Sequence, residues 1–91
     1  MNYTELKLRA LIAINEIRLK RGVSPLAVIP RGYPLNSEDC PLYRALVDCG
    51  IISVGVKSYS TENEDLEMPP VLIEFVRAVD TGMFPELSVA R

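Results

Sequence analysis

Residues 38–60 read EDCPLYRALVDCGIISVGVKSYS, and this one stretch combines a helical pattern with a strand pattern. Its first half has apolar residues at helical spacing, followed by a glycine that can end a helix: Leu42, Ala45, Leu46, Cys49 and Gly50. Its second half is rich in β-branched residues, which is typical of a strand. The stretch therefore predicts a helix over residues 38–49 and a strand over residues 51–60, which together indicate an α+β fold.

Two further helices are predicted, one on each side of this stretch. Residues 4–20 have the periodicity of a helix, and a first apolar stripe runs along it through Leu6, Ala10, Ala13, Ile14 and Ile17. A second apolar stripe on the same helix consists of Leu8, Leu11, Ile12 and Leu19. Pro69 and Pro70 open a third helix, because proline suits the first helical position. The apolar stripe of this third helix consists of Leu72, Phe75, Val76 and Val79.

The remaining segments connect these elements. Residues 22–37 are rich in proline and glycine and are predicted to form a loop with one short strand over residues 26–29. Residues 61–67 are acidic and are predicted to form a turn or loop, from which the chain returns through Leu66 and Met68 as a short antiparallel strand. The apolar tail, residues 82–91, is expected to pack back on the core. The prediction is thus a single compact domain, with three helices and a small two- or three-stranded antiparallel sheet.

Charge and hydropathy restrict the possible partners. The net charge is -2, but residues 1–31 hold six basic and two acidic residues, whereas residues 32–91 hold four basic and ten acidic residues. Either the two ends attract each other across the fold, or the basic end attracts phosphate. The longest apolar run, residues 10–14, is far shorter than the roughly 18–20 residues that a membrane span needs. No membrane association is therefore predicted.

The two cysteines, Cys40 and Cys49, are predicted to be reduced. Nine helical steps would separate them by about 13.5 Å and place them on opposite sides of one helix, beyond the reach of a disulfide. Reduced thiols indicate a cytoplasmic protein. Cys40 is expected to be the more reactive thiol, since a helix N-terminus lowers a thiol pKa, and Cys49 is expected to lie in the core.

The sequence offers little catalytic chemistry. It has no histidine, so a serine or cysteine nucleophile lacks its usual base, and two thiols alone are too few ligands for zinc. The five glycines are isolated, which excludes a glycine-rich phosphate loop. We therefore predict no catalytic, cofactor-binding or metal-binding residues, and an enzyme is the least expected function.

A DNA-binding regulator is the alternative function. Residues 40–58 read as helix, glycine and strand, which resembles the recognition helix and wing of a winged-helix domain. A basic cluster surrounds the end of the first helix and consists of Arg18, Lys20, Arg21 and Arg31. However, the predicted recognition helix offers Arg44 as its one basic residue among several acidic ones, and the pI is about 5.0. Nucleic acid is therefore not the expected partner.

Two surfaces are predicted to bind proteins. The second stripe of the first helix predicts a homodimer through Leu8, Ile12 and Leu19, unless the loop of residues 23–35 covers it. The loop of residues 31–37 is predicted to bind a partner protein, because it displays residue types that anchor interfaces: Arg31, Tyr33 and Leu35. The alternative for this loop is that its tyrosine and leucine fold down over the first helix.

Several stretches of the sequence are similar to a known group. Residues 18–22, 25–32, 39–46, 69–82 and 84–87 resemble small uncharacterised proteins of actinobacteria and their phages. This resemblance implies that residues 39–46 and the third helix belong to one recurrent domain, allows a phage-encoded origin and implies no activity. The expected function is a small, non-enzymatic accessory or regulatory protein that binds a host or partner protein.

Overall fold

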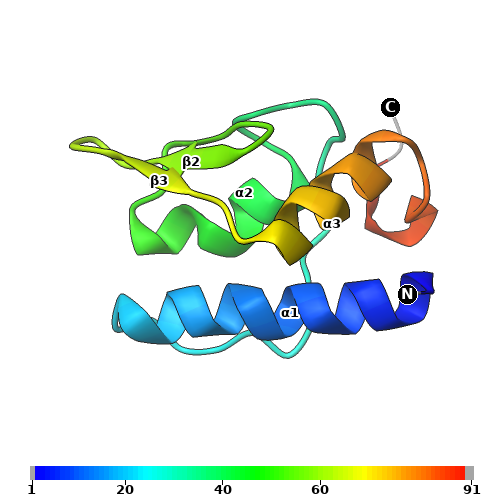
Figure 1. Ribbon diagram of the computed structural model, residues 1–91, viewed down its shortest axis with the longest axis horizontal. Coiled ribbons are helices and arrows are strands. Elements are labelled where there is room, and N and C mark those ends of the chain that lie inside the picture. Colours follow the sequence, from blue (N-terminus) through cyan, green and yellow to red (C-terminus); the bar gives the residue numbers. More distant parts are fainter. Residues whose placement is uncertain (1, 90–91) are drawn as a thin grey trace.

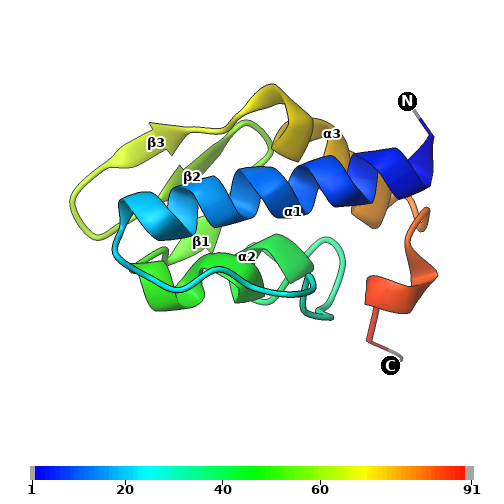
Figure 2. The same cartoon turned by 90° about the horizontal axis from the view of Figure 1, so that it is seen from below.

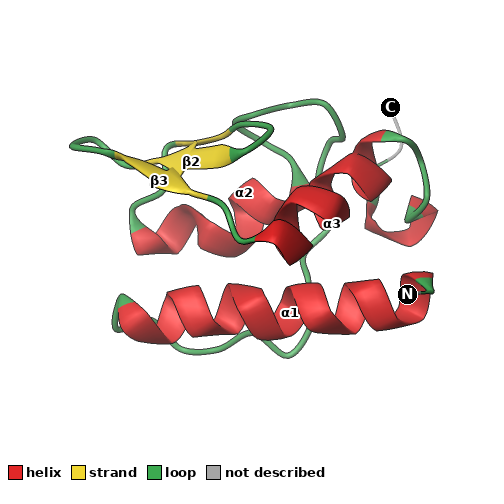
Figure 3. Ribbon diagram, in the orientation of Figure 1, coloured by secondary structure: helices red, strands yellow, loops and turns green. Residues whose placement is uncertain are grey.

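The computed structural model describes residues 2–89, which form a body of 32 × 24 × 20 Å. The predicted α+β class is confirmed, with three α-helices and a three-stranded antiparallel sheet (Figures 1 and 3). The elements in chain order are α1 (Tyr3–Lys20), α2 (Pro41–Leu46), the 3-10 helix η1 (Val47–Cys49), β1 (Ser53–Val54), β2 (Ser58–Ser60), β3 (Asp65–Glu67), α3 (Pro70–Asp80) and the 3-10 helix η2 (Pro85–Leu87). Helix α1 forms one layer, and α2, α3 and the sheet form the other (Figure 1).

Helix α1 begins and ends at residues that satisfy its terminal backbone groups. The side chain of Asn2 accepts a hydrogen bond from the Glu5 N–H at 2.8 Å. At the other end Gly22 has a φ of 74°, and the Val23 N–H donates to the Arg18 carbonyl at 2.8 Å. This is a Schellman motif, which a left-handed glycine favours. The predicted helix over residues 4–20 is confirmed, and it crosses the whole molecule (Figure 2).

The strand predicted over residues 51–60 is wrong, because the chain folds back within it. The Gly55 N–H donates to the Ser58 carbonyl at 2.7 Å, so Val56 and Lys57 form a two-residue turn between β1 and β2. The turn places Val54 opposite Tyr59, and both side chains are buried. In one straight strand these two side chains would point to opposite faces, so only one of them could reach the core. The predicted return strand is confirmed as β3, which pairs antiparallel with β2.

Two other predicted boundaries are also wrong. The helix expected over residues 38–49 begins only at Pro41, because a proline disfavours helical backbone at the residue before it, and Cys40 is extended at φ -74° and ψ 166°. No strand forms over residues 26–29. There the Asn15 amide takes the place of a strand partner, accepting from the Leu26 N–H at 2.7 Å and donating to the Leu26 carbonyl at 3.0 Å.

The core lies between α1, α2 and α3, and the C-terminal segment closes one end of it. Phe84 and Leu87 are buried, and the ring of Phe84 lies 5.6 Å from the ring of Phe75 in α3. Met83 stays 44 % exposed. Gly32 pairs with Ser88 in an isolated parallel bridge, which ties this segment to the long loop. The last two residues of the expected tail lie outside the described residues.

Candidate functional site

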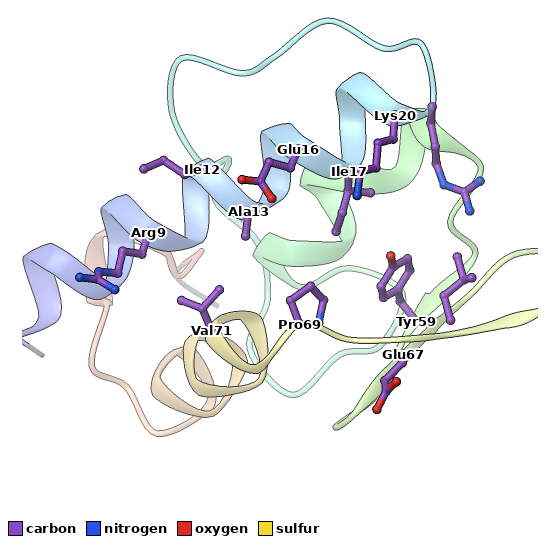
Figure 4. Close-up of a pocket in the computed structure, with 12 residues that line it drawn as sticks. Arg9, Ile12, Ala13, Glu16, Ile17, Lys20, Tyr59, Glu67, Pro69 and Val71 are labelled. Carbon is purple, nitrogen blue, oxygen red and sulfur yellow. The ribbon is translucent and has the colours of Figure 1, made fainter.

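A groove of about 870 Å³ lies between α1 and the sheet (Figure 4). One wall is the face of α1 from Arg9 to Lys20. The other wall consists of residues from β2, β3 and the start of α3, which are Tyr59, Leu66, Glu67, Pro69 and Val71. Because the two walls come from distant parts of the sequence, residues 9–21 and 59–71, the groove depends on how the two layers pack.

The middle of the groove is apolar. Ala13 and Ile17 of α1 face Pro69 and Val71 across it, and the first two are half-buried against the core (Figure 4). The small side chain of Ala13 leaves room between α1 and the start of α3. The groove can therefore take up apolar side chains without any movement of the backbone.

One end of the groove carries hydrogen-bond donors. Lys20 and Arg21, at the end of α1, line this end together with Tyr59. Burial raises the pKa of Tyr59, and the nearby positive charge of Arg21 partly offsets this effect. The Tyr59 phenol therefore stays protonated and can donate a hydrogen bond. Two cations and a hydroxyl donor favour an anionic group such as a carboxylate.

The other end of the groove carries Arg9, whose guanidinium donates to the Glu5 carboxylate at 2.9 Å. Glu16 lies on the rim between the two basic ends. The charge along the α1 wall therefore alternates as positive, negative and positive. A ligand with carboxylates at its two ends would match this order, whereas one with a central carboxylate would meet Glu16.

The predicted self-association residues remain exposed. Leu8, Ile12 and Leu19 are 59 %, 53 % and 61 % exposed, and Ile12 also lines the groove. The alternative that the long loop covers the second stripe is wrong for these three residues. Leu11, the fourth residue of the stripe, is half-buried against the core, and the loop is held to α1 by the paired hydrogen bonds between Asn15 and Leu26.

The predicted partner-binding loop lies apart from the groove. Its tyrosine, Tyr33, is half-buried, with the Arg44 guanidinium 5.6 Å from the ring centre. Arg31 is exposed and donates to the Ser88 carbonyl at 3.2 Å. Leu35 is 80 % exposed, has a φ of 64° and donates its N–H to the Asp80 carboxylate at 2.9 Å. The alternative that Leu35 folds down over α1 is therefore wrong.

The predicted basic cluster is smaller than its sequence suggests, because Arg18 is buried. Its guanidinium forms a bidentate pair with Asp48, at 2.6 Å and 3.0 Å, and also donates to the Ala45 carbonyl. Arg18 thus ties α1 to α2 and η1 and is not available to a ligand. Arg44 of the predicted recognition helix is also engaged, because it donates to Asp39 at 2.6 Å and thereby lowers the pKa of that carboxyl.

The two cysteines are free thiols and both are buried. The expectation that the helix N-terminus lowers the pKa of Cys40 is wrong, because burial raises the pKa of this thiol and of Cys49. The Cys40 sulfur instead caps α2 by accepting from the Tyr43 N–H at 3.4 Å. Within residues 2–89 no group of three or more acidic or thiol side chains is placed to hold a metal ion.

Comparisons with known proteins add no family. No protein-family model matches the chain, and no curated protein or solved structure matches it either. Among the described helices, none is both long and apolar enough to cross a membrane. Among the groove residues, the sequence had singled out Ile12 as part of the second apolar stripe, and Lys20 and Arg21 as part of the basic cluster. The rest of the groove gave no sequence signal, since its walls lie about 40 residues or more apart in the chain.

Proposed function

We propose that the protein is a small, non-enzymatic accessory or regulatory protein that binds an acidic, amphipathic segment of another protein in the groove between α1 and the sheet. The observation that carries this proposal is the combination of an apolar middle with a basic group at each end. Charge complementarity selects the partner, because Lys20 and Arg21 at one end and Arg9 at the other favour carboxylates.

The groove also sets the length of the segment. Arg9 and Lys20 are eleven residues apart on α1, which corresponds to about 16 Å along the helix axis. A partner helix of about 11 residues, or a strand of about five, spans this distance. Its apolar side chains would lie against Ala13 and Val71, and its acidic residues would lie near the two ends.

The alternative functions have weaker support. The residues that line the groove include two carboxylates, Glu16 and Glu67, but no thiol, so the groove offers no cysteine nucleophile. The acidic turn beside the groove disfavours a DNA-binding role, because Glu62 and Glu64 would repel a phosphate backbone. A short segment with acidic residues only near its ends carries less negative charge than a phosphate backbone, so this turn repels it less.

The test is selection from a random library of displayed peptides about 16 residues long. We expect enrichment of peptides that have apolar residues at helical or alternating spacing and an acidic residue towards each end. Their affinity should fall at least tenfold for the double variant Lys20→Glu/Arg21→Glu, because two favourable charges become repulsive. The variant Ala13→Leu should also weaken binding, because leucine fills the space that alanine leaves in the apolar middle.

A matched control separates the groove from net charge. The double variant Lys57→Glu/Arg77→Glu changes the net charge by the same amount at exposed positions that do not line the groove. It should bind the selected peptides within about twofold of the wild type. Circular dichroism checks that each variant is folded. A library without acidic amphipathic enrichment, or peptides whose binding is unaffected by Ala13→Leu, would contradict the proposal.

A further inference from the structure

The outer face of α1 has the residue spacing of a two-helix seam. Leu8, Ile12, Asn15 and Leu19 follow one another at intervals of four, three and four residues. This is the a/d spacing by which two helices pack along their length. The three apolar side chains are more than half exposed, and Asn15 is half-buried under the long loop. The loop thus covers the seam at Asn15 and leaves Leu8, Ile12 and Leu19 uncovered.

The charges beside the seam favour one orientation of a second helix. Arg9 and Glu16 are seven residues apart and flank the same side of the seam. In an antiparallel pair of identical helices, Arg9 of each copy faces Glu16 of the other, which gives two ion pairs. In a parallel pair, Arg9 would face Thr4 of the other copy and Glu16 would face Leu11, and both of these residues are uncharged. The helix dipoles also favour the antiparallel orientation.

A surface hollow fits the same arrangement. When Ile12 of one copy lies opposite Asn15 of the other, Leu8 lies opposite Leu19 of the second copy. Beside Leu8 the surface has a hollow of about 230 Å³, lined also by Leu11 and Val28. Leu19 of the second copy would enter this hollow, and Val28, which is 72 % exposed, would cover it. Leu19 of each copy thus complements the hollow beside Leu8 of the other copy across a two-fold axis.

We propose that the protein forms an antiparallel homodimer through the outer face of α1, with Leu8 packed against Leu19 and Arg9 paired with Glu16 across a two-fold axis. The contact from Leu8 to Leu19 is about 16 Å long and one helix wide, so it buries less than the roughly 800 Å² per partner of a standard interface. The dimer is therefore weak and exchanges with the monomer at micromolar concentrations. It does not depend on the proposed groove function.

Sedimentation equilibrium from about 1 µM to about 1 mM tests the proposal. The average mass of the wild type should rise from 10.1 kDa towards twice that value. Leu19→Glu should stay monomeric without loss of fold, because its side chain is 61 % exposed. The reversals Arg9→Glu and Glu16→Arg should each weaken the dimer about tenfold, because each turns two ion pairs into two repulsions.

The decisive measurement is a mixture of the two charge-reversed variants. Arg9→Glu and Glu16→Arg should restore dimerisation when mixed, because each copy supplies the charge that the other needs. Lys57→Glu is the control, and it should leave the dimer affinity unchanged because this exposed turn residue lies away from α1. Selected groove peptides should still bind Leu19→Glu, which separates this interface from the groove. A wild type that stays at 10.1 kDa at about 1 mM, or a mixture as weak as its components, would overturn the proposal.

Discussion

Replacement of Arg18 by leucine should remove a large share of the stability of this fold. The side chain is 5 % exposed and donates four hydrogen bonds, to the Ser24 carbonyl at 2.7 Å, to the Ala45 carbonyl at 2.8 Å and to both carboxylate oxygens of Asp48. Loss of one member of a buried ion pair costs about 3–5 kcal/mol. The carboxylate of Asp48 is 54 % exposed and can be hydrated in the variant, so the lower end of this range applies.

We therefore expect Arg18→Leu to lower the free energy of unfolding by about 3 kcal/mol and the Tm by roughly 15 °C. Urea unfolding followed by circular dichroism measures this change. Arg21→Leu is the matched control, since that side chain is exposed and should cost less than about 0.5 kcal/mol. A loss below about 1 kcal/mol for Arg18→Leu would refute the reasoning, because it would mean that the guanidinium contributes no more than a surface pair.

The same pair predicts a pH dependence. The hydrogen bonds from Arg18 lower the pKa of Asp48 in the folded chain below its ordinary value of 3.8. The unfolded state then binds more protons in this range, so the contribution of the pair is present above about pH 4 and is lost as the pH falls through the folded pKa. The stability of Arg18→Leu should fall less steeply below about pH 4 than that of the wild type. Equal slopes for the wild type and the variant would show that Arg18 does not lower the pKa of Asp48.

Three further predictions concern the long loop and the thiols. Gly32→Ala should cost at least about 2 kcal/mol in urea unfolding, because the added Cβ would lie 2.6 Å from backbone atoms of Asp39 and Cys40; an unchanged midpoint would contradict this close approach. Leu35→Asn should raise the free energy of unfolding by about 0.5 kcal/mol, since asparagine tolerates a φ of 64° better than leucine; destabilisation would instead indicate a packing role for the leucine. Both thiols should react slowly with Ellman's reagent at about pH 8 until the chain unfolds, and fast native labelling of Cys40 would contradict its burial.

Local signals in the sequence placed all three helices, although α2 begins three residues later than predicted. The apolar periodicity of α1, its Asn2 cap and the glycine after its end are all local signals, and they mark where the helix begins and ends. The proline at the start of α3 works in the same way. The β-branched run of residues 51–60 correctly placed strand structure there, although it did not show that the chain turns within the run.

The exposed second stripe could also be predicted from the sequence, because the helical spacing of Leu8, Ile12 and Leu19 places them together on α1 whatever packs against the opposite face. The sequence could not decide whether the loop covered them. That depends on Asn15, whose amide holds the loop at Leu26, while Leu8, Ile12 and Leu19 stay exposed.

Which charged side chains are buried, and where the groove lies, depend on contacts between distant parts of the chain. Arg18 belongs by sequence to a basic cluster, but the packing of α1 on α2 buries it against Asp48, thirty residues further along the chain. Likewise Ala13 and Val71 become opposite walls of one groove because α3 packs against α1. Local periodicity determines which face of an element is apolar, whereas long-range packing determines which of its residues meet, and a single sequence carries little information about the latter.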